Sequence, residues 1–396
     1  MQKNFYLTKK LPSYVFAKIY ELKQMANDLG QEIIDFGMGN PDSTPPQKVM
    51  QELSQLVCDG KLYGYSPTIG IETLRKAIAN FYHRRFNVEI DYKTEAMITI
   101  GSKEGIVSLA KAISSSKTYV CVASPCYPIH NYAFIIAGSK TQFISAINCY
   151  NFLEKFKEFV ENQTHKPQAV IVSYPCNPTG EIADLNFYQE LVSFCKKYQI
   201  LIISDIAYAE LYFDDKNKPH SILEVKGAKE IAIEFYSISK SYSMAGARVG
   251  FAVGNKDLIL ALYKIKSYLD YGSFTPLQMV AKSALEPDND DYLVKIRKLY
   301  QDRAEFFTKT VNQQLHWNIE QPKASMFCWT KLPKQFSHLS SFEFCKKMIL
   351  ETGVVFSAGS FFGENGEGYV RISMIHNQQK IQQACENMKK IFSYQI

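Results

Sequence analysis

Short apolar runs alternate with longer segments of helical period between about residues 95 and 285. This alternation predicts βαβ units around a mainly parallel sheet, and therefore an α/β fold. The runs that predict strands are residues 97–100, 119–122, 169–173, 200–204, 231–237 and 249–253. The first five end in polar or turn residues. Because ligands bind at the carboxyl ends of strands in open α/β sheets, we expect the chemistry at that edge.

Two helices are readable from the spacing of their apolar residues. One begins directly after Gly101, and its first turn holds Ser102, Lys103 and Glu104, so its amino end can bind an anion. The other is long and follows the acidic residues at 288, 290 and 291. We expect this second helix to lead from a large domain into a smaller one.

The chain beyond about residue 315 mixes strand and helix patterns. Strands are predicted at 326–330, 354–357 and 369–373, and Asn377 is placed to cap a final helix. We therefore expect three parts: an N-terminal segment (1–45) that packs on the small domain or on a partner subunit, a large domain (46–286) and a small α+β domain (287–396).

Composition and charge exclude several classes of protein. Hydrophobic residues make up 46% and aromatic residues 13% of the 396 residues, which is typical of a folded globular protein and excludes disorder. The formal charge of +6 is too small over this length to indicate a nucleic-acid partner. No apolar stretch approaches the ~18 residues of a membrane span, and residues 1–10 lack the apolar region that a secretion signal would carry, so we expect no export. We expect a soluble cytoplasmic protein.

The cysteines and histidines do not indicate a metal site. Nine cysteines occur singly, without a C-x-x-C pair, as expected of reduced thiols in a cytosolic protein. The seven histidines are dispersed, and we expect each to be a surface or satisfied interior residue.

Two strand ends carry groups that suggest a shared site. An apolar strand ends at Asp205, with Tyr208 three residues further on, and a buried carboxylate there requires a cationic neighbour. The other strand leads into Ser237 and Ser239, which fall on one side of an extended segment, and then into Lys240.

This set of groups suits a pyridoxal phosphate site. The Lys240 amine can form a Schiff base with the aldehyde, and Asp205 can hold the pyridine nitrogen protonated so that the ring accepts electrons. The serine hydroxyls, Arg248 and the helix start at Ser102 offer hydrogen bonds and positive potential to the phosphate. Asn177 follows a third strand, where its segment taken alone is a turn.

Several stretches resemble the class I and II aminotransferases of fold type I, which depend on pyridoxal 5'-phosphate. The resemblance runs nearly end to end and implies a large domain with a mainly parallel seven-stranded sheet plus a smaller α+β domain. Residues 266–278 most resemble alanine (glutamate–pyruvate) transaminases and LL-diaminopimelate aminotransferases. The matching stretches are residues 37–42, 65–70, 101–105, 125–128, 173–180, 205–208, 237–251 and 369–373.

The resemblance also implies roles for individual residues. Lys240 would be the Schiff-base lysine and Asp205 the partner of the pyridine nitrogen, with Asn177 and Tyr208 at the phenolic oxygen and Tyr127 stacked on the ring. Residues of several segments would hold the phosphate: Ser102, Lys103, Ser237, Ser239 and Arg248. The resemblance also implies a homodimer, in which Tyr65 of one subunit would reach the phosphate in the other.

The substrate-binding residues implied by the resemblance are Arg371, for the α-carboxylate, together with Gly39, Tyr14 and Asn177. Taken alone, Arg371 would be read as a solvated residue at the edge of the small domain. No arginine is assigned to a distal carboxylate. Two positions depart from the family: Ser204 stands where relatives commonly have His, and Ala247 where they commonly have Trp.

We therefore expect a ping-pong aminotransferase that moves the amino group of an L-amino acid, with alanine as first choice, to 2-oxoglutarate or pyruvate. LL-diaminopimelate, aspartate and aromatic amino acids remain open as donors. A C–S β-lyase of the same fold type would use the same lysine and aspartate. A non-catalytic regulator that binds the cofactor is disfavoured, because residues 1–40 leave no room for a winged helix-turn-helix.

Overall fold

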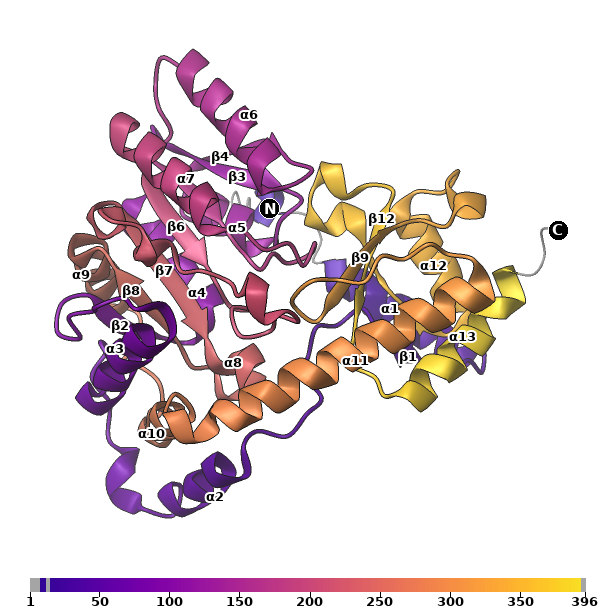
Figure 1. The fold of residues 1–396 in the computed structure, drawn as a ribbon, viewed down its shortest axis with the longest axis horizontal. Helices are drawn as coiled ribbons and strands as arrows, with labels where there is room; N and C mark the ends of the chain where they lie inside the picture. Colours follow the sequence, from indigo (N-terminus) through magenta and orange to yellow (C-terminus); the bar gives the residue numbers. More distant parts are fainter. Residues whose placement is uncertain (1–7, 12–14, 393–396) are drawn as a thin grey trace, which may run out of the picture.

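The large part of the molecule is built on a seven-stranded sheet in the order β2-β8-β7-β6-β5-β3-β4 (Figure 1). The computed structural model describes residues 8–11 and 15–392. Strand β8 pairs antiparallel with both of its neighbours, and the other pairs are parallel. The strands are β2 (Ala96–Thr99), β3 (Tyr119–Ser124), β4 (Lys140–Ser145), β5 (Ala169–Val172), β6 (Leu201–Asp205), β7 (Ala232–Ser237) and β8 (Gly250–Gly254). The predicted α/β sheet is confirmed.

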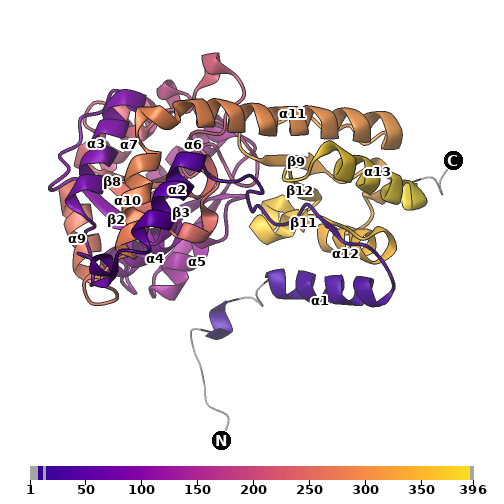
Figure 2. The ribbon, with the colours of Figure 1, turned by 90° about the horizontal axis from the view of Figure 1, so that it is seen from below.

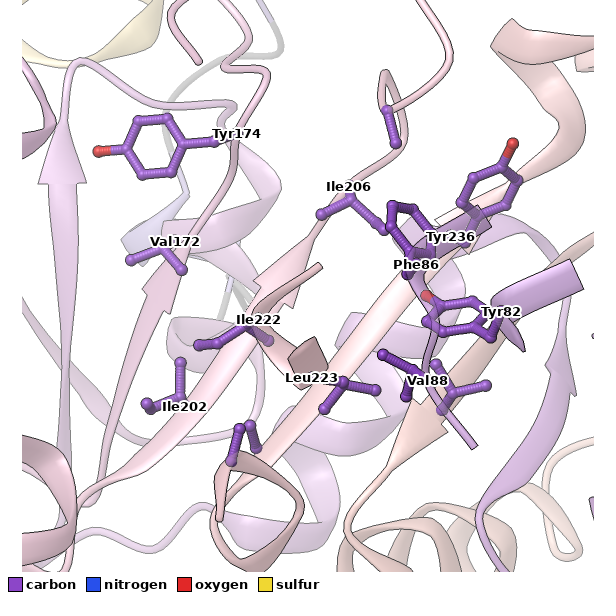
Figure 3. Close-up of a cluster of buried hydrophobic side chains, with 14 of the residues drawn as sticks. Tyr82, Phe86, Val88, Val172, Tyr174, Ile202, Ile206, Ile222, Leu223 and Tyr236 are labelled. Atoms are coloured by element: carbon purple, nitrogen blue, oxygen red, sulfur yellow. The ribbon is translucent and has the colours of Figure 1, made fainter. Parts of the chain in front are cut away.

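Helices cover both faces of this sheet. On one face, Val172, Ile202 and Tyr236 pack into a cluster with residues of helix α3 such as Phe86 (Figure 3). Residues of α6, α7 and α10 belong to the same cluster. On the other face, Ile171 and Ile203 pack with residues of α4, α5 and α9. Because both faces are buried, these strands appear in the sequence as continuous apolar runs. The helices are α3 (Glu72–Phe86), α4 (Gly101–Ile113), α5 (Ile129–Ile136), α6 (Cys149–Asn162), α7 (Leu185–Tyr198), α9 (Lys256–Lys266) and α10 (Thr275–Ala284).

Within the large sheet, β4 is the strand that the apolar runs did not predict. It lies at the edge of the sheet and pairs with β3 alone, and most of its side chains are exposed or half-buried. An edge strand of this kind carries polar residues and lacks the apolar run that marks the inner strands.

Helix α11 (Asp290–Leu315) runs from the large part to a smaller one (Figure 1). There an antiparallel sheet has the order β11-β12-β9, with β9 (Phe327–Lys331), β11 (Ser357–Ala358) and β12 (Tyr369–Ser373). The predicted strand 354–357 is divided, because its first half is β10 (Val354–Val355), which pairs with β1 (Ile34–Asp35). Helices α12 (Ser341–Thr352) and α13 (Gln378–Phe392) complete this part, and Asn377 caps α13 through the amide of Lys380.

The N-terminal segment packs on the smaller part. Helix α1 (Val15–Asp28) lies beside α12 (Figure 2), and Ile19, Leu22 and Ala26 are buried with Ile349 and Val355. The chain then crosses towards α2 (Gln47–Leu56). The domain boundaries at 45/46 and 286/287 remain our proposal. Within the described ranges, no helix is long and apolar enough to cross a membrane.

Candidate active site

Five parallel strands of the large sheet have their carboxyl ends on the same side of the sheet. Each of them ends at, or is followed by, a residue that the sequence analysis singled out. Strands β3, β5, β6 and β7 are parallel to one another, and β2 runs in the same direction because both β2 and β7 are antiparallel to β8. The residues placed there are Ser102 after β2, Tyr127 after β3, Asn177 after β5, Asp205 at the end of β6 and Lys240 after β7. The fold therefore gathers them, as expected of an open α/β sheet.

Asp205 is buried, with 4% of its surface exposed, and its carboxylate is held by two groups. Its Oδ2 lies 3.0 Å from Nε2 of His130, and its Oδ1 accepts a hydrogen bond from the amide of Ala207 over 3.3 Å. The ring of His130 in turn meets the ring of Tyr127 edge-on, with centroids 5.7 Å apart. These contacts fix the direction in which the carboxylate points.

His130 is a site residue that the sequence analysis missed. It is a satisfied interior residue as expected, since only 2% of it is exposed, but its partner is the proposed pyridine-binding carboxylate. Its position one helical turn after Tyr127 was the available signal, and the contact with Asp205, 75 residues away, was not visible in the sequence.

Lys240 lies on the one-turn helix α8 (Ile238–Ser241), which follows β7 directly. Ser237 caps this helix by accepting a hydrogen bond from the amide of Ser239. The Lys240 ammonium donates to the carbonyl oxygen of Gly39. Burial, together with the positive charges of Arg371 and Arg248, lowers the pKa of Lys240 to about 8. A neutral amine is the nucleophilic form of lysine, so this environment favours the reactive form of the side chain.

The start of α4 forms a cradle with Arg248. Gly101 has φ +75°, a conformation that favours glycine, and a Cβ there would lie 2.2 Å from Nη2 of Arg248 and would displace the guanidinium. Arg248 donates to Ser239 Oγ over 3.4 Å and to the carbonyl of Ile100 over 3.3 Å. Ser237 Oγ donates to Ser239 Oγ over 2.8 Å. A helix start, two hydroxyls and a guanidinium together fit a phosphate group.

The remaining predicted phosphate-binding positions differ in exposure. Ser102 and Lys103 lie in the first turn of α4, and the Lys103 side chain is exposed. Tyr65 is 86% exposed, and its ring lies on that of Tyr271 with centroids 4.5 Å apart.

Arg371 is buried with 4% exposed, although its sequence context alone suggested a solvated edge residue. That interpretation is wrong because β12 is the central strand of its sheet, and Arg371 points towards the large part. Its Nη1 donates to Asn177 Oδ1 over 2.8 Å and its Nη2 donates to the carbonyl of Gly37 over 2.7 Å. Burial lowers the pKa of Arg371 to about 10.

The Arg371 guanidinium has unused hydrogen-bonding capacity. Its Nε is buried without a hydrogen-bond partner among the described residues. Its planar group lies 4.2 Å from the ring centroid of Phe327 and 4.8 Å from that of Phe362. A buried cation held by carbonyl groups and aromatic rings is suited to receive a carboxylate.

Phe327 connects three of the predicted site residues and was not singled out by the sequence. Its ring meets that of Tyr208 at 5.4 Å and carries Arg371 on its face. A Cβ at Gly39 would lie 2.7 Å from the same ring, so glycine is required for the backbone to approach. Tyr208 is buried, which raises its pKa strongly. Tyr14, the other predicted substrate residue, lies outside the described residues.

The departure at Ser204 is explained by its partner. Ser204 is fully buried, and its Oγ donates over 2.9 Å to Glu234 on the neighbouring strand. Glu234 also accepts hydrogen bonds from Ser221, Tyr82 and the amide of Ile222. A hydroxyl at 204 therefore belongs to this buried network rather than to the site at the strand ends.

No set of three or more His, Cys, Asp or Glu side chains that could hold a metal ion occurs within residues 8–11 and 15–392.

Comparison with known proteins agrees with this geometry. The family model described as aminotransferase class I and II matches residues 31–388. The glutamate-pyruvate aminotransferase AlaC of Escherichia coli (strain K12) is 40% identical over 99% of this chain and 94% of its own length. An LL-diaminopimelate aminotransferase of Natranaerobius thermophilus is 36% identical over 97% of this chain and 98% of its own length.

Among solved structures, the substrate-bound BacF of Bacillus subtilis superposes with a TM-score of 0.91 at 30% identity, covering 99% of this chain and 98% of that one. The cradle at Gly101, the buried lysine at 240 and the carboxylate at 205 fit the cofactor that the family uses. The chain therefore belongs to the class I and II aminotransferases and is a fold type I enzyme dependent on pyridoxal 5'-phosphate.

Proposed function

We propose that this enzyme transfers the amino group of L-alanine to 2-oxoglutarate, and that it runs the same steps in reverse with pyruvate. The similarity to AlaC, named a glutamate-pyruvate aminotransferase, supports this choice over the whole chain. The observation that carries it is the pair of rings, Phe327 and Phe362, against the Arg371 guanidinium. The rings lie against the guanidinium, while its buried Nε hydrogen has no partner among the described residues and suits the α-carboxylate of an amino-acid donor. The choice of alanine among donors rests on the similarity to AlaC.

The cofactor, when bound, supplies an aldehyde that condenses with an amine and a ring that accepts the electron pair left at Cα. Lys240, with its pKa of about 8, would accept the substrate's Cα proton at Nζ and hold it for return. Asp205 would hold a proton on the ring nitrogen, and His130 orients Asp205. Protonation of that nitrogen is what makes the ring an electron acceptor.

Asn177 and Arg371 divide the recognition of cofactor and substrate. Because Asn177 Oδ1 accepts from Arg371, its Nδ2 hydrogens would be left for the cofactor's phenolic oxygen, to which the Tyr208 hydroxyl would also donate. Arg371 receives the substrate α-carboxylate, and Gly39 lets the N-terminal segment close on the substrate. The start of α4, Ser237, Ser239 and Arg248 hold the phosphate.

We also propose a homodimer in which Tyr65 completes the partner's site. The support is a set of exposed aromatic and apolar residues around the Tyr65–Tyr271 stack, an exposed patch of the kind that marks protein interfaces. Its members are Tyr63, Tyr65, Tyr268, Leu269, Tyr271 and Phe274. Sedimentation equilibrium of the holoenzyme tests the assembly, and a monomer at micromolar concentration contradicts it.

The donor is tested with a panel of amino acids at fixed 2-oxoglutarate, with glutamate formation as the readout. We expect the highest kcat/KM with L-alanine. A higher kcat/KM with LL-diaminopimelate, aspartate or an aromatic amino acid would overturn the proposed donor while leaving the aminotransferase activity intact. Ammonia release from cystathionine reports the β-lyase reaction, and the named relatives, all aminotransferases, do not support it.

A further inference from the structure

Lys266 is a fully buried lysine, with 0% of its surface exposed, at the end of α9. Its Nζ lies 2.8 Å from Glu104 Oε2 and 2.8 Å from Asp270 Oδ2. Lysine is almost never fully buried unless it is paired, and removing one member of such a set leaves an uncompensated charge in the interior. The two carboxylates, whose side chains are 27% and 20% exposed, therefore keep the buried charge of Lys266 paired.

Glu104 connects Lys266 to the proposed phosphate cradle. It lies in the first turn of α4, and the same Oε2 accepts a hydrogen bond from the amide of Ile100 over 2.9 Å. The carbonyl of Ile100 accepts from Arg248, and Gly101 follows immediately. Lys266 thus holds the carboxylate that fixes the backbone entering the cradle. It also offsets a negative charge that would otherwise repel the phosphate across one helical turn.

Asp270 connects Lys266 to the surface loop that carries Tyr271. Its Oδ1 accepts from the amide of Gly272 over 2.8 Å, and its carbonyl accepts from Thr68 Oγ1 over 3.0 Å. The loop 270–272 is thereby fixed to the segment that follows Tyr65. This loop gives Lys266 a second anchoring point outside α4.

We propose that Lys266 is a positioning residue for the cofactor phosphate: it fixes the first turn of α4 through Glu104 and ties that turn to the loop at Asp270. This inference rests on the proposed placement of the phosphate at the start of α4. Lys266 contacts Glu104 and Asp270, so its proposed effect on cofactor affinity is transmitted through these two carboxylates.

The test compares Lys266→Met with Lys264→Met, a matched change at an exposed lysine on the same helix. The dissociation constants of pyridoxal 5'-phosphate and of pyridoxal, which lacks the phosphate, are measured on the apoenzyme by titration of visible absorbance. We expect K266M to weaken pyridoxal 5'-phosphate about tenfold and to leave pyridoxal unchanged. K264M should match the wild type for both ligands.

Equal losses for both ligands in K266M would mean general loosening and would overturn the proposal, as would unchanged affinity for both. If K266M does not fold, K266M/E104Q/D270N, which also neutralises the two carboxylates left without their cation, is measured instead. A folded triple variant with wild-type affinity for pyridoxal 5'-phosphate also overturns the proposal. Failure of the wild type to bind pyridoxal 5'-phosphate would contradict the proposed function instead.

Discussion

Arg371 on β12 donates a hydrogen bond to Asn177 over 2.8 Å, which joins the smaller sheet to the end of β5 in the large sheet. The two residues are 194 positions apart in the chain. This bond places the group proposed for the substrate carboxylate beside a group proposed for the cofactor. We therefore expect any change in how the two parts of the molecule meet to alter the binding of substrate and the binding of cofactor together.

Replacing Arg371 with Lys tests the carboxylate-binding role. Lysine keeps the charge but cannot make the planar two-point contact or hold Asn177 in the same geometry. We expect kcat/KM for alanine to fall about a hundredfold, or about 2.7 kcal/mol, chiefly through KM. Steady-state kinetics measure this. Arg84→Lys, on α3, should leave kcat/KM unchanged, and an R371K enzyme with wild-type KM would contradict the role.

Gly39→Ala tests the close approach of the N-terminal segment to Phe327. The added methyl would lie 2.7 Å from the ring, so the ring or the segment must shift, and a shift of the segment would disturb the hydrogen bond from Lys240 to the Gly39 carbonyl. We expect KM for alanine to rise about tenfold, because an overpacked contact of this kind costs about 1–3 kcal/mol.

Two variants control the Gly39 experiment. Gly60→Ala, where a Cβ meets nothing within 4 Å, should have wild-type kinetics. The double variant G39A/F327L should recover part of the loss, because the smaller side chain makes room for the methyl. A G39A enzyme with unchanged KM would show that the segment has no part in substrate binding.

The pKa of Lys240 predicts a pH dependence for cofactor uptake. Burial and two arginines lower this pKa from 10.5 to about 8, so the ammonium loses its proton as the pH rises through about 8. Only the neutral amine attacks the aldehyde, and the initial rate of appearance of the visible absorbance should rise with pH over that range.

Stopped-flow mixing of apoenzyme with pyridoxal 5'-phosphate between about pH 6.5 and 9.5 measures this rate. Pyridoxamine 5'-phosphate has no aldehyde and serves as the control, since its binding should not show the same rise. A rate for pyridoxal 5'-phosphate that is flat across the range would refute the lowered pKa.

The buried carboxylate of Glu234 predicts a pH dependence of stability. Burial raises the pKa of Glu234 from 4.5 to about 7, so the folded state holds this proton more tightly than the unfolded state. Its contribution to stability is complete below about pH 4.5 and is lost as the pH rises through 7. Glu234→Gln cannot ionise, so its unfolding free energy should gain about 3 kcal/mol relative to the wild type across that window.

Urea unfolding of both proteins at several pH values measures the difference. Ser204→Ala provides a matched comparison: it removes one donor to the charged carboxylate, so the wild-type loss of stability should become larger in this variant. A difference between E234Q and the wild type that does not change with pH would contradict the raised pKa.

The inner strands and the main chemistry could be predicted from the sequence for a definite reason. Strands β5, β6 and β7 are buried on both faces and so appear as unbroken apolar runs, and their carboxyl ends mark where Asn177, Asp205 and Lys240 must lie. Edge strand β4 has no such run. The segment 354–357 appears as one strand, but it is shared between two sheets because its two halves have different partners.

The composition, the periodicity and the local motifs determined the α/β class, the order of the elements and the residues able to carry pyridoxal phosphate chemistry, because these depend on neighbours within a few turns of chain. The tertiary structure alone decided that His130 orients Asp205, that Phe327 supports Arg371, and that the buried Lys266 reaches Glu104, 162 positions away. Each of these relationships depends on a contact between residues more than forty positions apart or on burial by a distant element. Such contacts are set by how the sheets and helices pack, and local sequence carries no record of them.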